Sequence, residues 1–309
     1  MIYTITLNPS LDYVATLNSP LTIGEVNRAR GERFYPGGKG INVSIVLNRL
    51  GLATQALGFT AGFTGDEIKR LLDGCGCPHD FIAAGEGVSR ISVKLTQGGE
   101  TQINGGGPVI THNHIMALCE KLVHQCGIGP QDTVVLAGSV PEHTPADACE
   151  QVLAAVSARG ADIVADMTGK HLTHALAYAP LLIKPNLSEL CEVFDCAISG
   201  QAILSYARRL QKQGARNVLV SMGADGAILL CEDGSAYRAF SPKVQAVCTV
   251  GAGDSMVAGF LAGYGQKRDA REALALAVAA GTATAAAPWL CEREELLRLV
   301  DEVVIQGVQ

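Results

Sequence analysis

The chain has 309 residues, 48% of them hydrophobic, and a formal net charge of −6 at pH 7. This length and composition can bury a large core, as one large α/β domain or as two smaller domains. The acidic balance and the lack of a basic run argue against nucleic acid and anionic membranes as partners. The N-terminus, MIYTITLNPSLD, has no basic start and soon reaches Pro9 and Asp12, so we do not expect a signal peptide.

Two early segments show the alternation of apolar and polar residues that is typical of short strands with two different faces. They are residues 12–35 and residues 90–104, and the second contains a hairpin expected around Gly98 and Gly99. Short strands of this kind, outside the alternating part of the chain, predict a small separate sheet. Such a sheet could form a lid over an active site or the surface of a homodimer.

From residue 133 onward, strand-like and helix-like runs alternate. Strands are expected at 133–140, 161–169, 180–185 and 217–223, and helices at 146–160, 187–194 and 203–215. A hairpin is expected around Asp233 and Gly234, and the apolar run at 273–290 is interpreted as a buried helix followed by a turn, not as a membrane span. This order predicts a mostly parallel sheet flanked by helices, with the turns after its strands gathered on one edge. We interpret residues 1–309 as a single domain with an inserted lid.

The cysteines and histidines form no pattern that indicates a disulfide framework or a metal site. Ten cysteines are scattered through apolar segments, Cys75 and Cys77 are the only close pair, and neither CxxC nor HExxH occurs. His112 and His114 stand at the expected start of a helix, where they cap it or face solvent. We therefore expect buried, reduced thiols in a cytoplasmic protein and no histidine metal site.

The segment TVGAGDSMVAGF places small residues directly before a carboxylate at the expected start of a helix. Gly251, Ala252 and Gly253 permit a tight turn, and the unpaired N–H groups at a helix start favour an anion. Asp254 would repel that anion, which makes sense if its carboxylate deprotonates a hydroxyl next to a phosphoryl group. The alternative is that Asp254 caps the helix and the glycines only allow close packing. The dinucleotide pattern GxGxxG is not met, because Met256 stands at its last glycine.

A second glycine-rich segment, FYPGGKGINVSIVLNRLG, also leads into an expected helix. Gly37 and Gly38 form a turn, Lys39 supplies a cation suited to phosphate, and Asn42 can hydrogen-bond a sugar hydroxyl. The alternative is an ordinary joint between a loop and a helix, with Asn42 as its cap and Gly51 as its stop. The P-loop pattern GxxxxGK[ST] is not met here.

Together and in this order, the two motifs resemble those of the PfkB-type, ribokinase-like carbohydrate kinases. The resemblance covers essentially the whole chain and includes ITLNPSLD, GGKGINVS, RISVKLT, AGSVPE, KPNLSEL, VSMGADGA and TVGAGDSMVAG. It implies a ribokinase-like α/β fold with a small β-sheet lid, and phosphorylation of a sugar with ATP and Mg²⁺. One departure is Cys248, which stands where many members have the first Asp of DTxGAGD.

The resemblance also implies roles for single residues. Asp254 corresponds to the base that deprotonates the acceptor hydroxyl, and the N–H groups of Gly251, Ala252 and Gly253 correspond to an anion hole. The residues implied on the sugar side are Asp12, Gly37, Gly38 and Asn42 for the hydroxyls, with Lys39, Arg90 and Ser139 for the phosphate that the sugar already carries. The residues implied on the nucleotide side are Lys184, Asn186, Ser221, Gly223, Ala224, Asp225, Gly226 and Gly253.

The segment NLSE has two interpretations. Asn186 followed three residues later by Glu189, after a proline, is a capping box. The resemblance implies that Asn186 and Glu189 also organise Mg²⁺ around the phosphates, through water. The two interpretations are compatible.

The expected acceptor follows from the GGKG, RISVKL and TQINGGGP segments, which resemble the branch of the family that acts on phosphorylated hexoses. Fructose 1-phosphate is the expected acceptor and fructose 1,6-bisphosphate the product, with tagatose 6-phosphate and fructose 6-phosphate as alternative acceptors. Two other classes are a sugar-phosphate sensor without catalysis, which would not need Asp254, and a dinucleotide-dependent dehydrogenase, which would need GxGxxG. We expect a homodimer through the lid.

Overall fold

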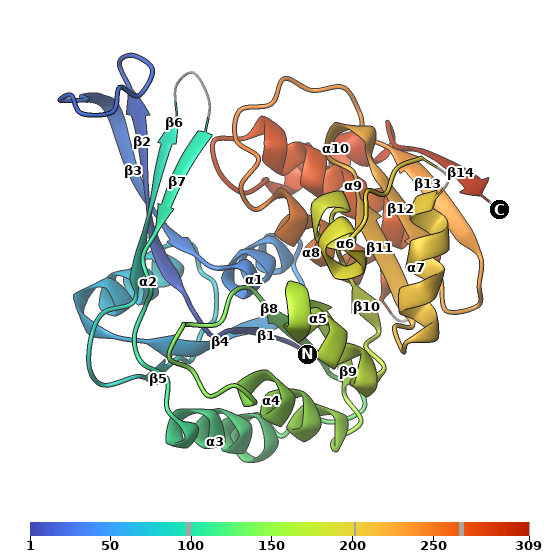
Figure 1. Ribbon diagram of the computed structural model, residues 1–309, viewed down its shortest axis with the longest axis horizontal. Helices are drawn as coiled ribbons and strands as arrows, with labels where there is room; N and C mark the ends of the chain where they lie inside the picture. The colour runs from blue at the N-terminus through green and yellow to red at the C-terminus, as the bar shows by residue number, and fades with distance from the viewer. Residues whose placement is uncertain (97–99, 201, 266–268, 309) are drawn as a thin grey trace.

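The computed structural model describes residues 1–96, 100–200, 202–265 and 269–308 (Figure 1). Its main sheet consists of β1 (Ile2–Thr6), β4 (Thr54–Thr60), β5 (Ile82–Ala83), β8 (Thr133–Ala137), β9 (Asp162–Asp166), β10 (Leu182–Ile183), β11 (Asn217–Ser221), β12 (Ala227–Leu230), β13 (Ala236–Phe240) and β14 (Val304–Val308). The strand order is β14-β13-β12-β11-β10-β9-β8-β1-β4-β5. The pairs from β11 to β5 are parallel, and β12, β13 and β14 add an antiparallel edge.

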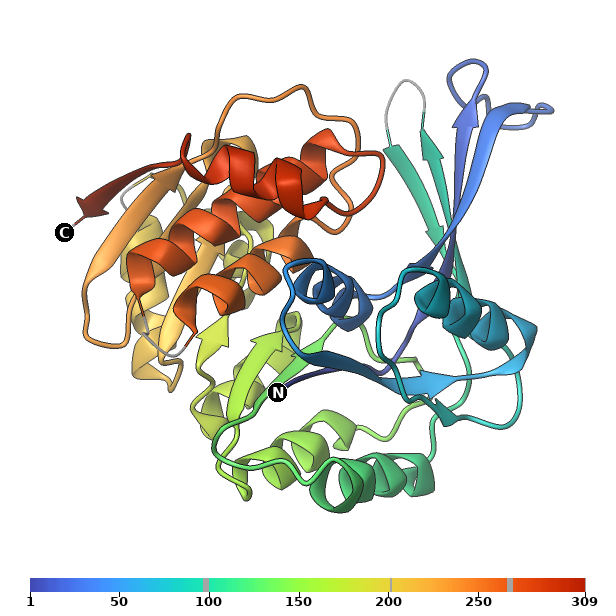
Figure 2. The ribbon, with the colours of Figure 1, turned by 180° about the vertical axis from the view of Figure 1, so that it is seen from behind.

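Helices cover both faces of this sheet, and each layer closes its own buried core (Figure 2). One layer consists of α3 (His112–Glu120), α4 (Ala148–Ser157), α5 (Gly169–Ala175), α6 (Leu187–Phe194) and α7 (Ala202–Lys212). The other consists of α1 (Lys39–Arg49), α2 (Gly62–Gly74), α8 (Ala252–Tyr264), α9 (Ala270–Ala286) and α10 (Arg293–Val300). On β9, Ile163 packs into the first core and Val164 into the second, which is why the strands read as continuous apolar runs.

A second, four-stranded sheet projects from the main body (Figures 1 and 2). It consists of β2 (Ser10–Leu17), β3 (Ala29–Gly37), β6 (Arg90–Thr96) and β7 (Glu100–Asn104), in the order β3-β2-β6-β7. At its base, the Tyr35 ring stacks on Trp289 with the ring centroids 4.7 Å apart, which ties β3 to the segment after α9. The expected small sheet is therefore confirmed, whereas the hairpin expected at Gly98 and Gly99 lies outside the described residues.

Most of the expected elements are present but shorter than the sequence suggested. The expected strand at 180–185 is reduced to the two residues of β10, because Pro185 has no N–H to donate. Gly51, Gly160 and Gly234 take positive φ angles after α1, after α4 and in the β12–β13 turn, as expected of residues that end helices and form hairpins.

The remaining expectations concern the thiols, the histidines and the membrane. All ten cysteines are free, but four are buried and six are only half-buried, so the expected burial holds for part of them. The His114 imidazole completes a capping box with Thr111 at the start of α3. Within the described ranges, every helix is too short or too polar to span a membrane.

Candidate active site

A cavity of about 330 Å³ lies between the small sheet and the starts of α1 and α8. The predicted site residues that line it are Asp12, Gly38, Lys39, Asn42, Arg90, Ser139, Gly251 and Asp254. The structure thus brings together residues from both glycine-rich motifs, from the small sheet and from the loop after β8. Such a place, at the carboxyl ends of parallel strands, is where α/β proteins bind their ligands.

Asp254 lies in the first turn of α8, and its carboxylate is buried. It is not the helix cap, because Gly251 takes that position with φ 80° and a side chain at Gly251 would collide with Leu290. Instead, the Asn42 Nδ2 amide donates a hydrogen bond of 2.7 Å to Asp254 Oδ2. The alternative that Asn42 caps α1 is therefore wrong as well, since Gly38 is the N-cap of that helix. One hydrogen bond, from Asn42 to Asp254, therefore joins the two glycine-rich motifs.

A fully buried carboxylate, Asp166, lies between two lysines at the end of β9. The Lys39 Nζ atom is 3.2 Å from Asp166 Oδ1, and Lys184 Nζ is 3.5 Å from the same oxygen. Lys39 Nζ also lies 3.8 Å from Glu189 Oε1. One carboxylate therefore connects a cation of the GGKG motif with a cation expected on the nucleotide side, and Lys39 is directed toward that side.

The charges of this cluster shift the pKa values of its members. Burial first, and then the negative charge of Asp166, raise the pKa of Asp254 to about 6. Burial alone would raise the pKa of Asp166, but the charges of Lys184 and Lys39 keep it below its ordinary value. Asp254 is therefore suited to accept a proton near neutral pH, while Asp166 stays ionised.

The small sheet contributes a second carboxylate, Asp12, on the face that lines the cavity. Ser10 Oγ donates a hydrogen bond of 2.6 Å to Asp12 Oδ1, and Lys94 Nζ forms an ion pair with Asp12 Oδ2. Gly37 on β3 leaves room for this carboxylate, because a Cβ there would lie 2.3 Å from Asp12 Oδ1. Gly37, which was predicted as a site residue, does not line the cavity itself but leaves room for a side chain that does.

Arg90, at the start of β6, is a cation of the cavity that donates a hydrogen bond to a neutral group. Its Nε donates to the Asn8 carbonyl oxygen at 3.2 Å, and burial lowers the pKa of the guanidinium, which stays charged. Asn8 is also buried, and its Nδ2 donates to the Gly106 carbonyl oxygen at 3.1 Å. The segment LNPSLD therefore holds Arg90 at the cavity wall through a backbone carbonyl.

The residues expected to bind a nucleotide lie next to this cavity rather than on its wall. Lys184 would contact a side chain at position 253, with its Nζ 3.0 Å from the Cβ that Gly253 lacks. Asn186 pairs with Ser221 in a parallel bridge, which joins the NLSE segment to the end of β11. Gly223, Ala224 and Asp225 form one turn of 3₁₀ helix that Gly226 ends.

The capping box at the start of α6 is present. The Asn186 side chain accepts a 2.8 Å hydrogen bond from Glu189 N–H, and the Glu189 carboxylate accepts one of 2.8 Å from Asn186 N–H. The expected turn at Gly251–Gly253 is also present, although Ala252 N–H donates to the Thr249 carbonyl oxygen at 3.2 Å.

The donor set fits Mg²⁺ held by a few oxygens together with phosphates and water. Asp166 Oδ2 is buried without a hydrogen-bond partner, and Glu189 lies in the same cluster through Lys39. Carboxylate oxygens are the ligands that Mg²⁺ prefers. In the part of the chain that the structure describes, no group of three or more His, Cys, Asp or Glu side chains could form a full protein cage.

Several residues of this region were not predicted from the sequence, among them Lys94, Asp166 and Asn8. Lys94 follows Arg90 by four positions on β6, so the strand period of two places both side chains on one face and could have revealed it. Asp166 ends an apolar strand, which is the position of a site residue in this class of sheet. Asn8 precedes the predicted Asp12, but no local pattern marks its contact with Arg90.

The architecture and the site agree with what comparisons of this chain with known proteins show. Residues 6–290 match the pfkB family of carbohydrate kinases. The chain belongs to this family. It is 42% identical to the 1-phosphofructokinase of Bacillus subtilis, with 99% of each chain covered. It is 34% identical to the D-tagatose-1-phosphate kinase of Bacillus licheniformis, again over 99% of each chain.

The fold of this kinase is shared with a crystal structure of phosphofructokinase-2 from Escherichia coli in complex with fructose-6-phosphate. The TM-score is 0.89 at 26% identity, and 97% of this chain and 98% of that chain are covered. The expected α/β architecture, with a mostly parallel sheet, flanking helices and a small separate sheet, is confirmed. The family match also argues against the dehydrogenase alternative.

Proposed function

We propose that this kinase transfers the γ-phosphoryl group of ATP to the free primary hydroxyl of fructose 1-phosphate and releases fructose 1,6-bisphosphate and ADP. The observation that carries the proposal is the buried Asp254 carboxylate, which shares one cavity with Arg90 and with the helix start at Gly251. A base, a cation for a bound phosphate and an anion-binding turn are what the reaction requires. The relatives named 1-phosphofructokinase and D-tagatose-1-phosphate kinase support an acceptor whose phosphate is on C1.

Asp254 acts as the general base in this proposal. The acceptor oxygen attacks the γ-phosphorus while the bond from that phosphorus to the β–γ bridging oxygen breaks, and the hydroxyl proton passes to Asp254. The N–H groups of Gly251, Ala252 and Gly253 stabilise the charge on the transferred group, with Ala252 N–H exchanging its bond to Thr249 for one to the phosphoryl oxygen. Asn42 holds one carboxylate oxygen of Asp254 and leaves the other for the hydroxyl.

The cations divide between two phosphate groups. Lys39 and Lys184 share Asp166, so they are proposed to flank the transferred phosphoryl group, and Lys39 also lines the cavity proposed for the sugar. Arg90, with Ser139 across the cavity, receives the phosphate that the sugar already carries. Asp12, Gly38 and Asn42 bind the sugar hydroxyls. Mg²⁺, when bound with ATP, would neutralise the phosphate charge, and Asn186, Glu189 and Asp166 would hold it through water.

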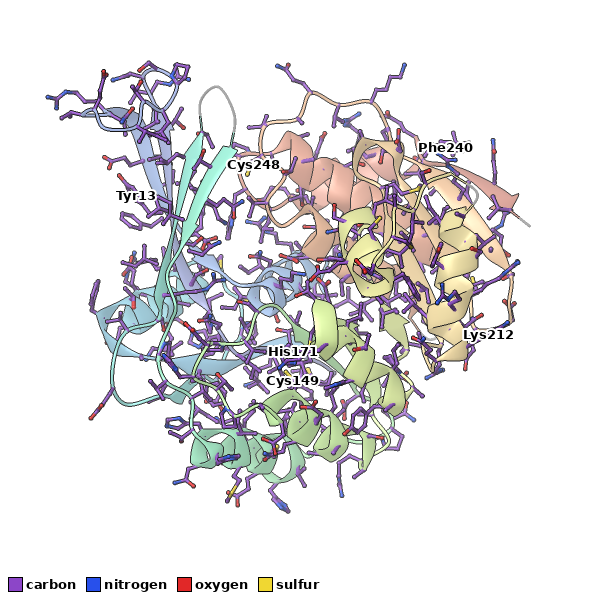
Figure 3. The ribbon with its side chains drawn as sticks, viewed as in Figure 1. Tyr13, Cys149, His171, Lys212, Phe240 and Cys248 are labelled. Carbon is purple, nitrogen blue, oxygen red and sulfur yellow. The ribbon has the colours of Figure 1, made fainter. Side chains whose placement is uncertain are left out.

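The nucleotide is proposed to lie along the starts of α6 and α8. The residues that support this are Lys184, Asn186, Ser221, Gly223, Ala224, Asp225, Gly226 and Gly253. Apart from Gly253, which lies in the first turn of α8, they stand at or just after the ends of β10 and β11. Cys248 lies on the side of the main body that faces the small sheet (Figure 3). It stands where many family members have the first Asp of DTxGAGD, and this departure removes none of the groups proposed to bind the nucleotide.

We also propose that residues 1–309 act as one domain whose small sheet is a lid and a dimer surface. The strand register places Asp12 and Lys94 on the cavity face, and Tyr13, Phe34, Ile91 and Ile103 on the opposite face. Phe34, Ile91 and Ile103 are exposed, and Figure 3 shows Tyr13 pointing away from the main body. Because Phe34, Ile91 and Ile103 form an exposed apolar surface on this face, a second copy presenting the same face is its proposed occupant.

The test of the substrate is a coupled assay of ADP release with ATP and Mg²⁺. The acceptors are fructose 1-phosphate, tagatose 1-phosphate, tagatose 6-phosphate, fructose 6-phosphate and unphosphorylated fructose. We expect fructose 1-phosphate to have the highest kcat/KM. Faster turnover of a 6-phosphate would overturn the substrate assignment, and tight binding of a sugar phosphate without any turnover would favour the sensor alternative. For the dimer, Ile103→Asp is expected to give a monomer by light scattering, and a wild-type monomer would contradict it.

A further inference from the structure

Lys94 is a buried lysine on the small sheet, and its side chain lines the sugar cavity. Only 7% of its surface is exposed, and 5% of that of its ion-pair partner Asp12. A buried ammonium group is retained in a fold only where it is paired, because removing it from water is costly. We therefore expect Lys94 to have a function that an apolar residue at position 94 could not provide.

The strand register explains how Lys94 reaches its partner. On β2 and β6, Asp12 pairs with Ser92 and Val14 pairs with Lys94, so both charged side chains stand on the cavity face as diagonal neighbours, offset by two residues. The Asp12 carboxylate is held by Lys94 and by Ser10 Oγ, and it occupies the space that a side chain at Gly37 would fill. Its place does not depend on a bound sugar.

The charge of Asp12 also acts on Arg90. The two groups are close enough that the Asp12 carboxylate favours the charged form of the guanidinium and partly opposes the effect of burial on its pKa. The hydrogen bond of Arg90 goes to the Asn8 carbonyl oxygen, whereas Asp12 is paired with Lys94. Without Lys94, an uncompensated carboxylate would attract Arg90 and repel a phosphate.

We propose that Lys94 is a specificity-determining residue of the sugar site, which neutralises Asp12 and so keeps Arg90 available for the phosphate on the sugar. Lys94 thereby allows a carboxylate that binds hydroxyl groups to stand beside an anionic substrate. This inference rests on the proposed function, because it assumes a phosphorylated acceptor. Lys94 acts through Asp12 and Arg90, which makes it a positioning residue.

The first test is the affinity for fructose 1-phosphate, measured by titration calorimetry without ATP. Lys94→Met is expected to weaken binding by about tenfold or more, since it leaves a buried charge without its partner. Lys94→Arg keeps the charge and is expected to restore most of the affinity. Lys121→Met is the matched control, because Lys121 also pairs with an aspartate, Asp80, and does not line the cavity. Equal affinities of Lys94→Met and the wild type would overturn the proposal.

The second test separates neutralisation of Asp12 from direct contact between Lys94 and the sugar. The double variant Asp12→Asn, Lys94→Met removes both charges, so it is expected to bind fructose 1-phosphate more tightly than Lys94→Met alone. A double variant that binds no more tightly than Lys94→Met would overturn the proposal. If Lys94→Met does not fold, Lys94→Gln gives the same comparison, because glutamine has no charge but can still donate a hydrogen bond to Asp12.

The outcomes distinguish this inference from the proposed function. A wild type that binds tagatose 1-phosphate but not fructose 1-phosphate would refute the proposed substrate, and the same variants titrated with tagatose 1-phosphate would then decide the role of Lys94. The KM for ATP provides the internal check. It is expected to stay within about threefold of the wild type in Lys94→Met, whereas a general loss of structure would change it together with sugar binding.

Discussion

The candidate site has two charged walls that are built in different ways: one lines the cavity, and the other, of which Lys39 and Asp254 line the cavity, extends behind it. On the small sheet, Asp12 and Lys94 form one buried pair, and Arg90 stands beside it with a neutral partner. At the edge of the main sheet, Lys39, Lys184 and Asp166 form a connected network next to Asp254. The first wall balances its charges one by one and leaves a single cation for a ligand. The second sets Lys39 and Lys184 against Asp166 and Glu189, next to a base whose pKa is raised by burial and by the charge of Asp166.

We infer from this difference that one wall serves phosphoryl transfer and the other serves sugar binding. Charge moves during phosphoryl transfer, so the groups around it must be held rigidly, and the network is anchored on β9, β10, α1 and α8. Sugar binding requires only recognition of a fixed charge and some hydroxyl groups. The charged groups of this wall lie on strands that project from the main body. Substitutions in the two walls are therefore expected to change kcat, KM and stability to different extents.

Asp254→Asn should have the largest effect, because it removes the proposed base from the rigid wall. We expect kcat to fall by roughly 10³- to 10⁴-fold while the KM for the sugar phosphate changes little. The measurement is the coupled assay of ADP release. Asp195→Asn is the control, since Asp195 is exposed, has a positive φ that asparagine tolerates, and should keep full activity. A kcat within tenfold of the wild type would mean that another group accepts the proton.

Asp166→Asn should have the next largest effect, because both lysines of the network lose their shared carboxylate. We expect kcat to fall by roughly 10²-fold, since small displacements of groups around the reacting atoms are costly. The pH profile gives a second measurement. In the wild type, activity should fall below pH 6, where Asp254, with a pKa of about 6, takes up a proton.

The direction of the shift in Asp166→Asn follows from its cause. The negative charge of Asp166 raises the pKa of Asp254, so its removal should lower that pKa and move the acidic limb of the profile to lower pH. Asp162→Asn on the same strand loses an ion pair with Arg216 and should leave the profile unchanged. An acidic limb that stays in place or moves to higher pH would contradict the proposed coupling of the two carboxylates.

Gly37→Ala should have an intermediate effect and should act on the sugar wall alone. The added Cβ would lie 2.3–2.5 Å from the Asp12 carboxylate, which must move. We expect the KM for the sugar phosphate to rise by roughly tenfold, with a smaller change in the KM for ATP. Gly31→Ala on the same strand meets no atom within 4 Å and should behave as the wild type. Equal changes in both KM values would show that the two walls are not independent.

The smallest effects are expected at Asn186, which caps α6 and is also proposed to help hold Mg²⁺. Asn186→Ala should lower the free energy of unfolding by about 1 kcal/mol, because α6 loses its cap, whereas Asn186→Ser should restore it. If Asn186 also organises Mg²⁺, both variants should need a few times more Mg²⁺ for half-maximal activity. A serine variant that regains both stability and the normal Mg²⁺ requirement would leave Asn186 with capping alone.

Much of the fold could be predicted from the sequence because its signals are local. The alternation on β2 and β6, the glycines that end α1 and α4, and the NLSE capping box depend on residues that are at most a few positions apart. The same holds for the start of α8, where Gly251 takes the left-handed conformation. The lengths of the strands were less predictable. At β10 the sequence shows that Pro185 cannot extend the strand, but it does not show that pairing with β9 and β11 is limited to Leu182 and Ile183.

The two glycine-rich motifs were also visible in the sequence, and with them the groups that could hold a phosphate and take a proton. The sequence alone determined these residue types, because a turn without side chains, a cation or a carboxylate at a helix start is a property of a short segment.

Only the tertiary structure decided which of these groups meet. Asn42 bonds to Asp254 over 212 residues, Lys39 to Asp166 over 127 and Lys94 to Asp12 over 82. These contacts arise from sheet order and register, which the chain sets by burying its two cores rather than by any local pattern. They also set the pKa of Asp254 and the partner of Asp12, since a charge responds to whatever the fold places beside it.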